Sequence, residues 1–191
     1  MIARPAFGLA IVGLGASLAP LDIAVNVALP AITAHFRLAL GDVQWLVICY
    51  VLVYGSLMLV CGKLGDLFGH RLIFRIGLLV SALGCAACAL ATEWPLFLWA
   101  RASQGLGTAL ALSCTPALAT SVFPAEQRLK ALAGFSMAMS LAAAAGPFLG
   151  GVVVQLWDWQ AVYWMRVPLA LATLALSGAL PSPKPQASTW D

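Results

Sequence analysis

The chain alternates long apolar runs with short breaks that carry charged or turn-forming residues. A helix that crosses a bilayer needs about 20 mostly apolar residues. Only helices and closed barrels satisfy the backbone hydrogen bonds inside lipid, and these runs are continuous rather than alternating, which favours helices. The pattern therefore predicts an all-α membrane protein with six spans, at about residues 6–32, 43–62, 72–91, 95–118, 131–154 and 161–180.

The breaks between the runs read HFRLALGD, GKLGDLFGHR, TEWP, FPAEQRLK and LWDWQ. Each contains charge or turn chemistry, and each is short. We therefore expect one six-helix domain over residues 1–180. The last residues, 181–191, read PSPKPQASTWD, and this polar, proline-rich composition predicts a disordered cytoplasmic tail.

Composition supports a lipid environment. Of 191 residues, 62% are hydrophobic and 9% are charged, and the mean hydropathy is +0.96. A soluble domain carries about 25% charged residues, so the charge available here is too little to cover a soluble surface. The net charge of +3 is small and no basic run is present, which argues against a nucleic-acid partner.

The first apolar run permits two interpretations. One Arg, an apolar stretch and the sequence ASLA are features of a signal peptide. Pro20 would follow the cleavage point directly, however, and the apolar run continues to Pro30. We favour a first spanning helix, with a signal peptide as the alternative.

The distribution of basic residues predicts the orientation, because Lys and Arg favour the cytoplasmic side. A cytoplasmic N-terminus places seven of the ten basic residues on or near that side: Arg4, Lys63, Arg71, Arg75, Arg128, Lys130 and Lys184. Arg37 and Arg166 then fall outside, and Arg101 lies within span four. Four tryptophans gather near the outer boundary, where Trp is common: Trp94, Trp157, Trp159 and Trp164. We expect a multi-pass protein of the cell membrane with both termini cytoplasmic.

Residues 62–71, GKLGDLFGHR, concentrate charge and glycine between two apolar runs. We call this segment the signature turn and expect a tight cytoplasmic turn, since its glycines permit close backbone approach and positive φ. Lys63 and Arg71 support the orientation. Asp66 adds little to it, and one interpretation is a helix-capping carboxylate.

The pattern GxLxDxxGxR resembles the signature loop of the major facilitator superfamily of secondary transporters. The matching residues are Gly62, Leu64, Asp66, Gly69 and Arg71. The resemblance implies that Asp66 helps to latch two halves of a transporter in the outward-open state. Leu67 and His70 stand where the family usually has Arg, which weakens the charge cluster.

Other segments resemble motifs of the same superfamily in the same order. They read LDIAVNVALPAI, QWLVICYVL, RASQGLGTA, AAAAGPFLGG and DWQAVYWMRVP, and span residues about 20–170. The resemblance implies an N-terminal six-helix bundle of two inverted three-helix repeats, most like the fourteen-span drug/proton antiporters. Three positions depart from it. The first motif is one residue short after Asp22, Ala142 replaces a Gly, and Arg166 replaces an Asn and adds charge near the outer interface.

Asp22 and Arg101 are charged residues inside predicted spans, where charge is costly and usually functional. Burial penalises the charged form of a carboxyl, so Asp22 is a candidate proton carrier; a paired structural acid is the alternative. Asp22 lies about 12 Å below the outer end of span one and Arg101 about 9 Å below that of span four, at 1.5 Å per residue. The resemblance implies that spans one and four pack around the cavity, so at these similar depths we expect the two side chains to face the bundle interior within reach of each other, directly or through water. The resemblance implies that Arg101 takes part in proton coupling, and interfacial snorkelling is its alternative.

Span five contains Gly146, Pro147, Gly150 and Gly151 in the order GPxxGG. Small residues allow close helix packing, and Pro147 can kink a helix. The resemblance implies the antiporter hinge of the family, and generic helix packing is the alternative.

Nothing in the sequence predicts an enzyme, a cofactor or a metal site. Cys85 and Cys88 form a CxxC pair, but no second pair or nearby His accompanies them. They are better explained as small apolar residues of a helix.

The sequence therefore predicts a half-length transporter, with proton-coupled efflux of lipophilic or drug-like molecules as the leading function. The expected partners are lipid, protons and a small-molecule substrate, together with a second copy of the chain or a separate C-terminal half. Two alternatives stay open: a truncated fragment that does not transport, and a transporter of another small solute.

Overall fold

The computed structural model describes residues 5–181, and this part of the chain consists of helices joined by short turns, without strands. The first span comprises α1 (Pro5–Ser17), η1 (Pro20–Ile23) and α2 (Ala24–Phe36). Spans two to four are α3 (Leu40–Phe68), α4 (His70–Leu90) and α5 (Trp94–Ser121). After η2 (Ala125–Gln127) come α6 (Arg128–Trp157), α7 (Ala161–Trp164), α8 (Arg166–Leu176) and η3 (Ser177–Ala179). The all-α prediction is confirmed.

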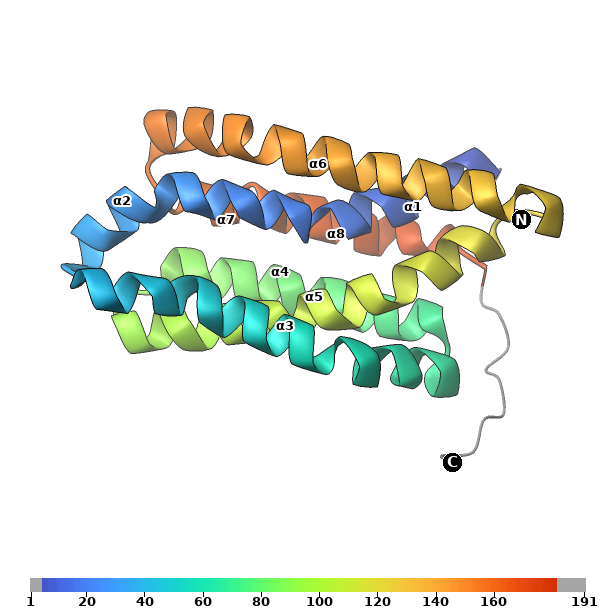
Figure 1. The fold of residues 1–191 in the computed structure, drawn as a ribbon, viewed down its shortest axis with the longest axis horizontal. Helices are drawn as coiled ribbons and strands as arrows, with labels where there is room; N and C mark the ends of the chain where they lie inside the picture. The colour runs from blue at the N-terminus through green and yellow to red at the C-terminus, as the bar shows by residue number, and fades with distance from the viewer. Residues whose placement is uncertain (1–4, 182–191) are drawn as a thin grey trace.

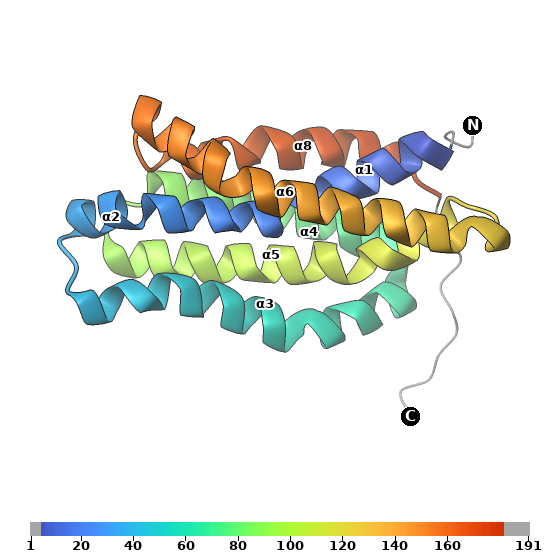
Figure 2. The ribbon, with the colours of Figure 1, turned by 45° about the horizontal axis from the view of Figure 1, so that its top comes forward.

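The long helices lie along one common axis, and the chain reverses direction at the two ends of the bundle (Figure 1). α5 packs against α3 and α4, while α6 packs against α1 and α2. Figure 2 shows α6 crossing in front of the first span, with α3 beside α5 and with α8 at the opposite edge from α3. The interior between these helices holds the site described below.

Five segments of the described chain are long and apolar enough to cross a membrane: Pro5–Phe36, Gly41–Phe68, His70–Leu90, Ala125–Trp157 and Ala161–Ala179. α5 is equally long, but it is less apolar because it carries Arg101, Gln104 and Thr108. These polar side chains are buried among the other helices. The protein is thus a multi-pass membrane protein whose most polar span lies inside the bundle.

α4 and α5 approach each other closely because glycines face backbone atoms. A Cβ placed on Gly77 would lie 2.4 Å from the backbone N of Ala111, and one on Gly107 would lie 2.4 Å from that of Ser81. Small residues at such contacts are typical of helix packing in membranes. This contact fixes α5, and therefore Arg101, against the rest of the bundle.

The first span is not the single helix predicted over residues 6–32. It is interrupted at residues 18–23, which we call the break. Leu18 N donates to Gly15 O at 3.4 Å and Ala19 N to Ala16 O at 3.2 Å, which are three-residue steps rather than α-helical ones. Pro20 follows and has no N–H to continue the ladder. Hydropathy does not register such a break, since the residues around it stay apolar.

The signature turn is also shorter than predicted. Gly62, Gly65 and Asp66 lie in the last turns of α3, and α4 begins at His70. Among the described glycines, only Gly69 has a positive φ, at 97°. The reversal is therefore made at one residue, because the helix continues beyond the apolar run before it ends. The predicted tail, apart from Pro181, lies outside the described residues.

Candidate functional site

Asp22 lies within the break, in the short 3-10 helix η1. Both oxygens of its carboxylate bind Arg101 of α5, with Nη1 to Oδ1 at 2.8 Å and Nη2 to Oδ2 at 2.9 Å. Gln104 Nε2 donates to Oδ1 at 3.1 Å. Paired bonds of this kind between guanidinium and carboxylate are strong and directional. The predicted meeting of Asp22 and Arg101 is confirmed, and the shortened motif does not turn Asp22 away.

Arg101 is held by further contacts within the bundle. Its Nε donates to the backbone oxygen of Leu46 in α3 at 3.1 Å, and its Nη1 donates to Gln104 Oε1 at 2.7 Å. The guanidinium lies 4.6 Å from the centre of the Tyr50 ring, a cation–π arrangement. Because the side chain is only 1% exposed, the snorkelling interpretation is wrong.

The position of the Arg166 side chain differs from the prediction. We expected it outside, near the outer interface, but its side chain is fully buried, at 0% exposure. Its Nη1 donates to Asp22 Oδ1 at 2.6 Å and its Nη2 to the backbone oxygen of Leu18 at 2.8 Å. Arg166 begins α8, directly after the short α7. A long side chain at that position reaches inward, where the carboxylate of Asp22 compensates its charge.

These residues form one group, which we call the charge cluster: Asp22, Arg101, Gln104 and Arg166. One carboxylate faces two guanidiniums, so the cluster carries a net charge of +1 when all three groups are ionised. Both arginines are buried, whereas the Asp22 side chain is 12% exposed. Asp22 is therefore the charged member that borders the surface, and a proton bound there would raise the net charge to +2.

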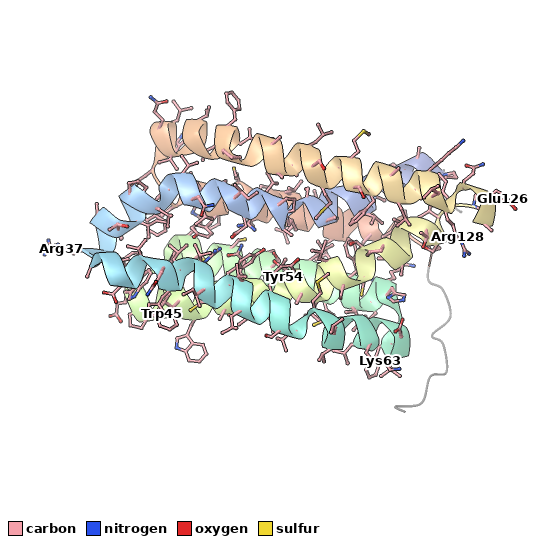
Figure 3. The ribbon with its side chains drawn as sticks, in the orientation of Figure 1. Arg37, Trp45, Tyr54, Lys63, Glu126 and Arg128 are labelled. Carbon is pink, nitrogen blue, oxygen red and sulfur yellow. The ribbon has the colours of Figure 1, made fainter. Side chains whose placement is uncertain are left out.

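The signature turn holds a weaker pair. His70 Nε2 lies 3.2 Å from Asp66 Oδ1, with side-chain exposures of 21% and 44%. Arg71 Nη2 donates to the backbone oxygen of Gly178 at 2.6 Å and so ties α4 to the end of span six. Figure 3 places Lys63 and Arg128 at one end of the bundle and Arg37 at the other. The two predicted cytoplasmic loops thus share one end.

The GPxxGG motif of α6 packs on the break. A Cβ on Gly150 would lie 2.9 Å from both the Cβ and the backbone oxygen of Ala24. The same addition at Gly146 would come no closer than 3.6 Å to any atom, and at Gly151 no closer than 3.9 Å. Pro147 is exposed within the continuous helix α6. Gly150 is therefore the motif residue at which α6 packs most closely on the first span. Its contact there is Ala24, two residues after Asp22.

The tryptophans do not all behave as interface residues. Trp159 is buried, and its ring lies 5.7 Å from Phe36 and 5.6 Å from Phe97. Trp94 joins the same aromatic group through Phe97 at 5.7 Å. Trp157 and Trp164 are exposed. The aromatic residues near this end therefore serve partly as a core that ties α2 and α5 to the turn before α7.

Three residues around Asp22 are not predicted as members of the site from the sequence: Gln104, Tyr50 and Arg166. Gln104 had a usable signal, since it follows Arg101 by three residues and so shares a helix face with it. Tyr50 donates to Thr108 Oγ1 at 3.4 Å and had no distinguishing pattern. Arg166 was assigned by its position along the chain, which does not reveal where a long side chain points.

Comparison with known proteins identifies the family. The family model described as Major Facilitator Superfamily matches residues 6–189. The methylenomycin A resistance protein of Bacillus subtilis is 35% identical over 87% of this chain and 36% of its own length. The tetracenomycin C resistance and export protein of Streptomyces glaucescens is 36% identical over 90% of this chain and 32% of its own. The chain thus spans about a third of the length of these relatives.

Solved structures share the fold. A bacterial homologue of the human lysosomal transporter Spinster, in an inward-facing and unoccupied conformation, matches with a TM-score of 0.82 at 18% identity. The match covers 100% of this chain and 46% of that one. The POT family transporter PepTSo matches with a TM-score of 0.84 at 11% identity. At these identities the likeness concerns the fold alone, which corresponds to one half of each structure.

Proposed function

Because the chain belongs to the Major Facilitator Superfamily, we propose that it takes part in proton-coupled efflux of lipophilic or drug-like molecules. The chain is a transporter-type membrane protein, and transport rather than catalysis is the activity we assign to it. The resistance and export names of several relatives, including the multidrug resistance protein Stp of Mycobacterium tuberculosis, support efflux. Antiport with protons is the finer part of the proposal.

The observation that carries the proposal is the charge cluster at the break in span one. An acid within a membrane span is costly and is a functional candidate by default. Asp22 is bound by two arginines and is the charged group of the cluster that reaches the surface. Binding and release of a proton at this carboxylate would change the charge that holds four spans together. We assign proton coupling to Asp22 and Arg101 on this basis.

A second six-helix bundle is part of the proposal. Alternating access requires two bundles to rock around a shared site. α3 and α6 expose many large apolar side chains, while the first span places the exposed Asn26 and the partly exposed Asp22 between them. Contact of such polar groups with lipid is unfavourable. We propose that another copy of the chain or a separate half covers this face, and that an isolated monomer does not transport.

The membrane orientation is also a proposal. The end that bears Lys63 and Arg128 (Figure 3) is assigned to the cytoplasm by the excess of basic residues. Single cysteines introduced at residues 35–42 or 92–95 in a variant without native cysteines should react with an impermeant maleimide from outside intact cells. A cysteine at 62–68 should react only after permeabilisation. Labelling of the signature turn from outside would overturn the orientation.

Transport tests the proposed function. The purified chain is reconstituted in liposomes, a pH gradient is imposed, and efflux of a lipophilic dye is followed. Cross-linking of the same preparation shows whether the chain is a dimer. If copies pair, we expect proton-driven efflux that is lost in Asp22→Asn and kept in Asp42→Asn, which changes an exposed carboxylate at the start of α3.

The outcomes separate the alternatives. Efflux that is equal in the wild type and in Asp22→Asn would contradict proton coupling at Asp22. Absence of efflux from a monomer, together with its absence after co-expression with the C-terminal half of a relative, would favour a fragment that does not transport.

A second solute class is worth including, because the riboflavin transporter RibZ of Clostridioides difficile is 26% identical over 93% of this chain. Uptake of riboflavin by the reconstituted chain would favour that alternative.

A further inference from the structure

Arg166 contacts both ends of the break in span one. Its Nη2 binds the backbone oxygen of Leu18, at the start of the break, and its Nη1 binds the carboxylate of Asp22, near its end. The side chain comes from α8 in span six and is completely buried. One guanidinium therefore bridges the interrupted stretch of the first span from the side.

The chemistry of this bridge requires a guanidinium. Its N–H groups form a rigid, planar fork that can serve two acceptors in fixed directions. A Lys ammonium is a compact point charge on a flexible stem, and an Asn side chain is much shorter. The two bonds of 2.6 Å and 2.8 Å lie on different nitrogens of Arg166, whereas Lys or Asn would have to reach both acceptors from a single nitrogen.

The two arginines of the charge cluster are anchored to different spans. Arg101 belongs to α5 and binds the backbone of α3 through Leu46. Arg166 belongs to span six and binds the backbone of span one through Leu18. Both donate to the same atom, Oδ1 of Asp22. This oxygen is therefore a joint between spans two and four on one side and spans one and six on the other.

We propose that Arg166 is a positioning residue that fixes the break and holds Asp22 in place for the proposed proton coupling. When Asp22 loses its charge, Arg166 keeps its bond to Leu18 in the first span, and Arg101 keeps its bond to Leu46 in α3. The bonds of both arginines to the Asp22 carboxylate weaken, so spans two and four can separate there from spans one and six. The link to coupling rests on the proposed function. The positioning of the break does not depend on transport and is tested separately.

Amide hydrogen exchange of the full chain in lipid nanodiscs tests the positioning. The variants are Arg166→Asn, which also lowers the net charge of the cluster from +1 to 0, and Arg166→Lys, which keeps the charge but not the fork. We expect Arg166→Asn to speed exchange of the amides at residues 18–24 about tenfold or more, as the loss of charge-assisted bonds predicts. Exchange in α4 should stay unchanged. Arg166→Lys should give an intermediate rate.

Arg71→Asn is the matched control. It likewise removes an arginine bond to a backbone oxygen, but this oxygen is that of Gly178 in span six, away from the break. It should leave exchange at residues 18–24 unchanged. Unchanged exchange at the break in Arg166→Asn would overturn the proposal. So would equal acceleration in every helix, because that is the result of a residue that merely stabilises the fold. If Arg166→Asn does not fold, wild-type protection of the break in Arg166→Lys would overturn it instead.

A transport arm separates this proposal from the proposed function. Where the reconstituted chain shows proton-driven efflux, Arg166→Asn should reduce the dependence on the pH gradient, and Arg166→Lys should restore part of it. Full coupling in Arg166→Asn would contradict the role in coupling. Absence of efflux in the wild type would count against the proposed function, and the exchange result would still decide whether Arg166 positions the break.

Discussion

The charge cluster and the signature turn each pair a carboxylate with a basic side chain, but in opposite surroundings. In the cluster, Asp22 binds two arginines that are buried, and it also accepts a bond from Gln104. In the turn, Asp66 has a His partner at 3.2 Å, and 44% of its side chain is exposed. Breaking a buried pair leaves a buried charge without compensation, whereas an exposed pair contributes little. The ion pairs of Asp22 should therefore contribute far more to the stability of the fold than the ion pair of Asp66.

The two regions differ in how many spans their polar contacts connect. The charge cluster joins spans one, two, four and six through side-chain and backbone bonds. In the signature turn, the pair of Asp66 and His70 joins α3 to α4, and Arg71 binds the end of span six. A rearrangement of the bundle is thus constrained at the cluster, while the Asp66 and His70 side chains of the turn are partly exposed.

Asp22→Asn should have the largest effect on stability. It leaves Arg101 and Arg166 buried with no carboxylate between them, a change that typically costs about 3–5 kcal/mol. Thermal unfolding of the purified protein can be followed with a thiol-reactive dye, because Cys61, Cys85, Cys88 and Cys114 are buried. Asp42→Asn, at an exposed carboxylate, is the control and should change little.

A double variant sharpens this prediction. Asp22→Asn raises the net charge of the cluster from +1 to +2, and the further change Arg166→Asn returns it to +1. The double variant should therefore be more stable than Asp22→Asn alone, since coupled neighbours are not additive. If the double variant loses as much free energy of unfolding as the two single variants together, charge compensation does not explain the cluster.

Gly150→Ala and Gly65→Ala compare backbone contacts in the two regions. The new Cβ at Gly150 would meet backbone and Cβ atoms of Ala24 at 2.9 Å, and neither can move without the helix. At Gly65 it would meet His70 Nδ1 at 2.5 Å and Cys114 Sγ at 2.8 Å, which belong to side chains. We expect Gly150→Ala to cost about 1–3 kcal/mol, as overpacking does, and Gly65→Ala to cost less. Equal melting temperatures would contradict this distinction.

The sequence predicts a contact well where the contact depends mainly on the depth of each residue within its span. The meeting of Asp22 and Arg101 follows from their similar depths, from the cost of a charge in lipid, and from the family resemblance, which implies that spans one and four pack around the cavity. The break at residues 18–23 and the inward direction of Arg166 did not follow, because hydropathy records neither hydrogen-bond steps nor side-chain direction. The close α4–α5 contact at Gly77 and Gly107 depends on which backbone lies opposite, and one helix alone does not show that.

Within the signature turn, the backbone should matter more than the ion pair. Gly69 has φ 97° and ψ 125°, a region that L-residues rarely adopt. Gly69→Ala should cost about 1–3 kcal/mol, the usual range for backbone strain of this kind. Thermal unfolding measured beside Asp66→Asn checks the order. A smaller loss in Gly69→Ala than in Asp66→Asn would place the ion pair first and contradict this interpretation.

Asp66→Asn should have the smallest effect of the series on stability. His70 Nε2 lies 3.2 Å from Asp66 Oδ1, and both side chains are partly exposed. The pair should therefore contribute less than about 1 kcal/mol to the free energy of unfolding. His70→Arg replaces the ring with a permanent charge and should change stability by no more than that. Both variants leave the charge cluster intact, so amide exchange at residues 18–24 should match the wild type. If Asp66→Asn lowered the melting temperature as much as Asp22→Asn, exposure would not be what separates the two regions. In that case the Asp66 carboxylate would have to be buried by another part of the assembly, and cross-linking at the turn would identify the contact.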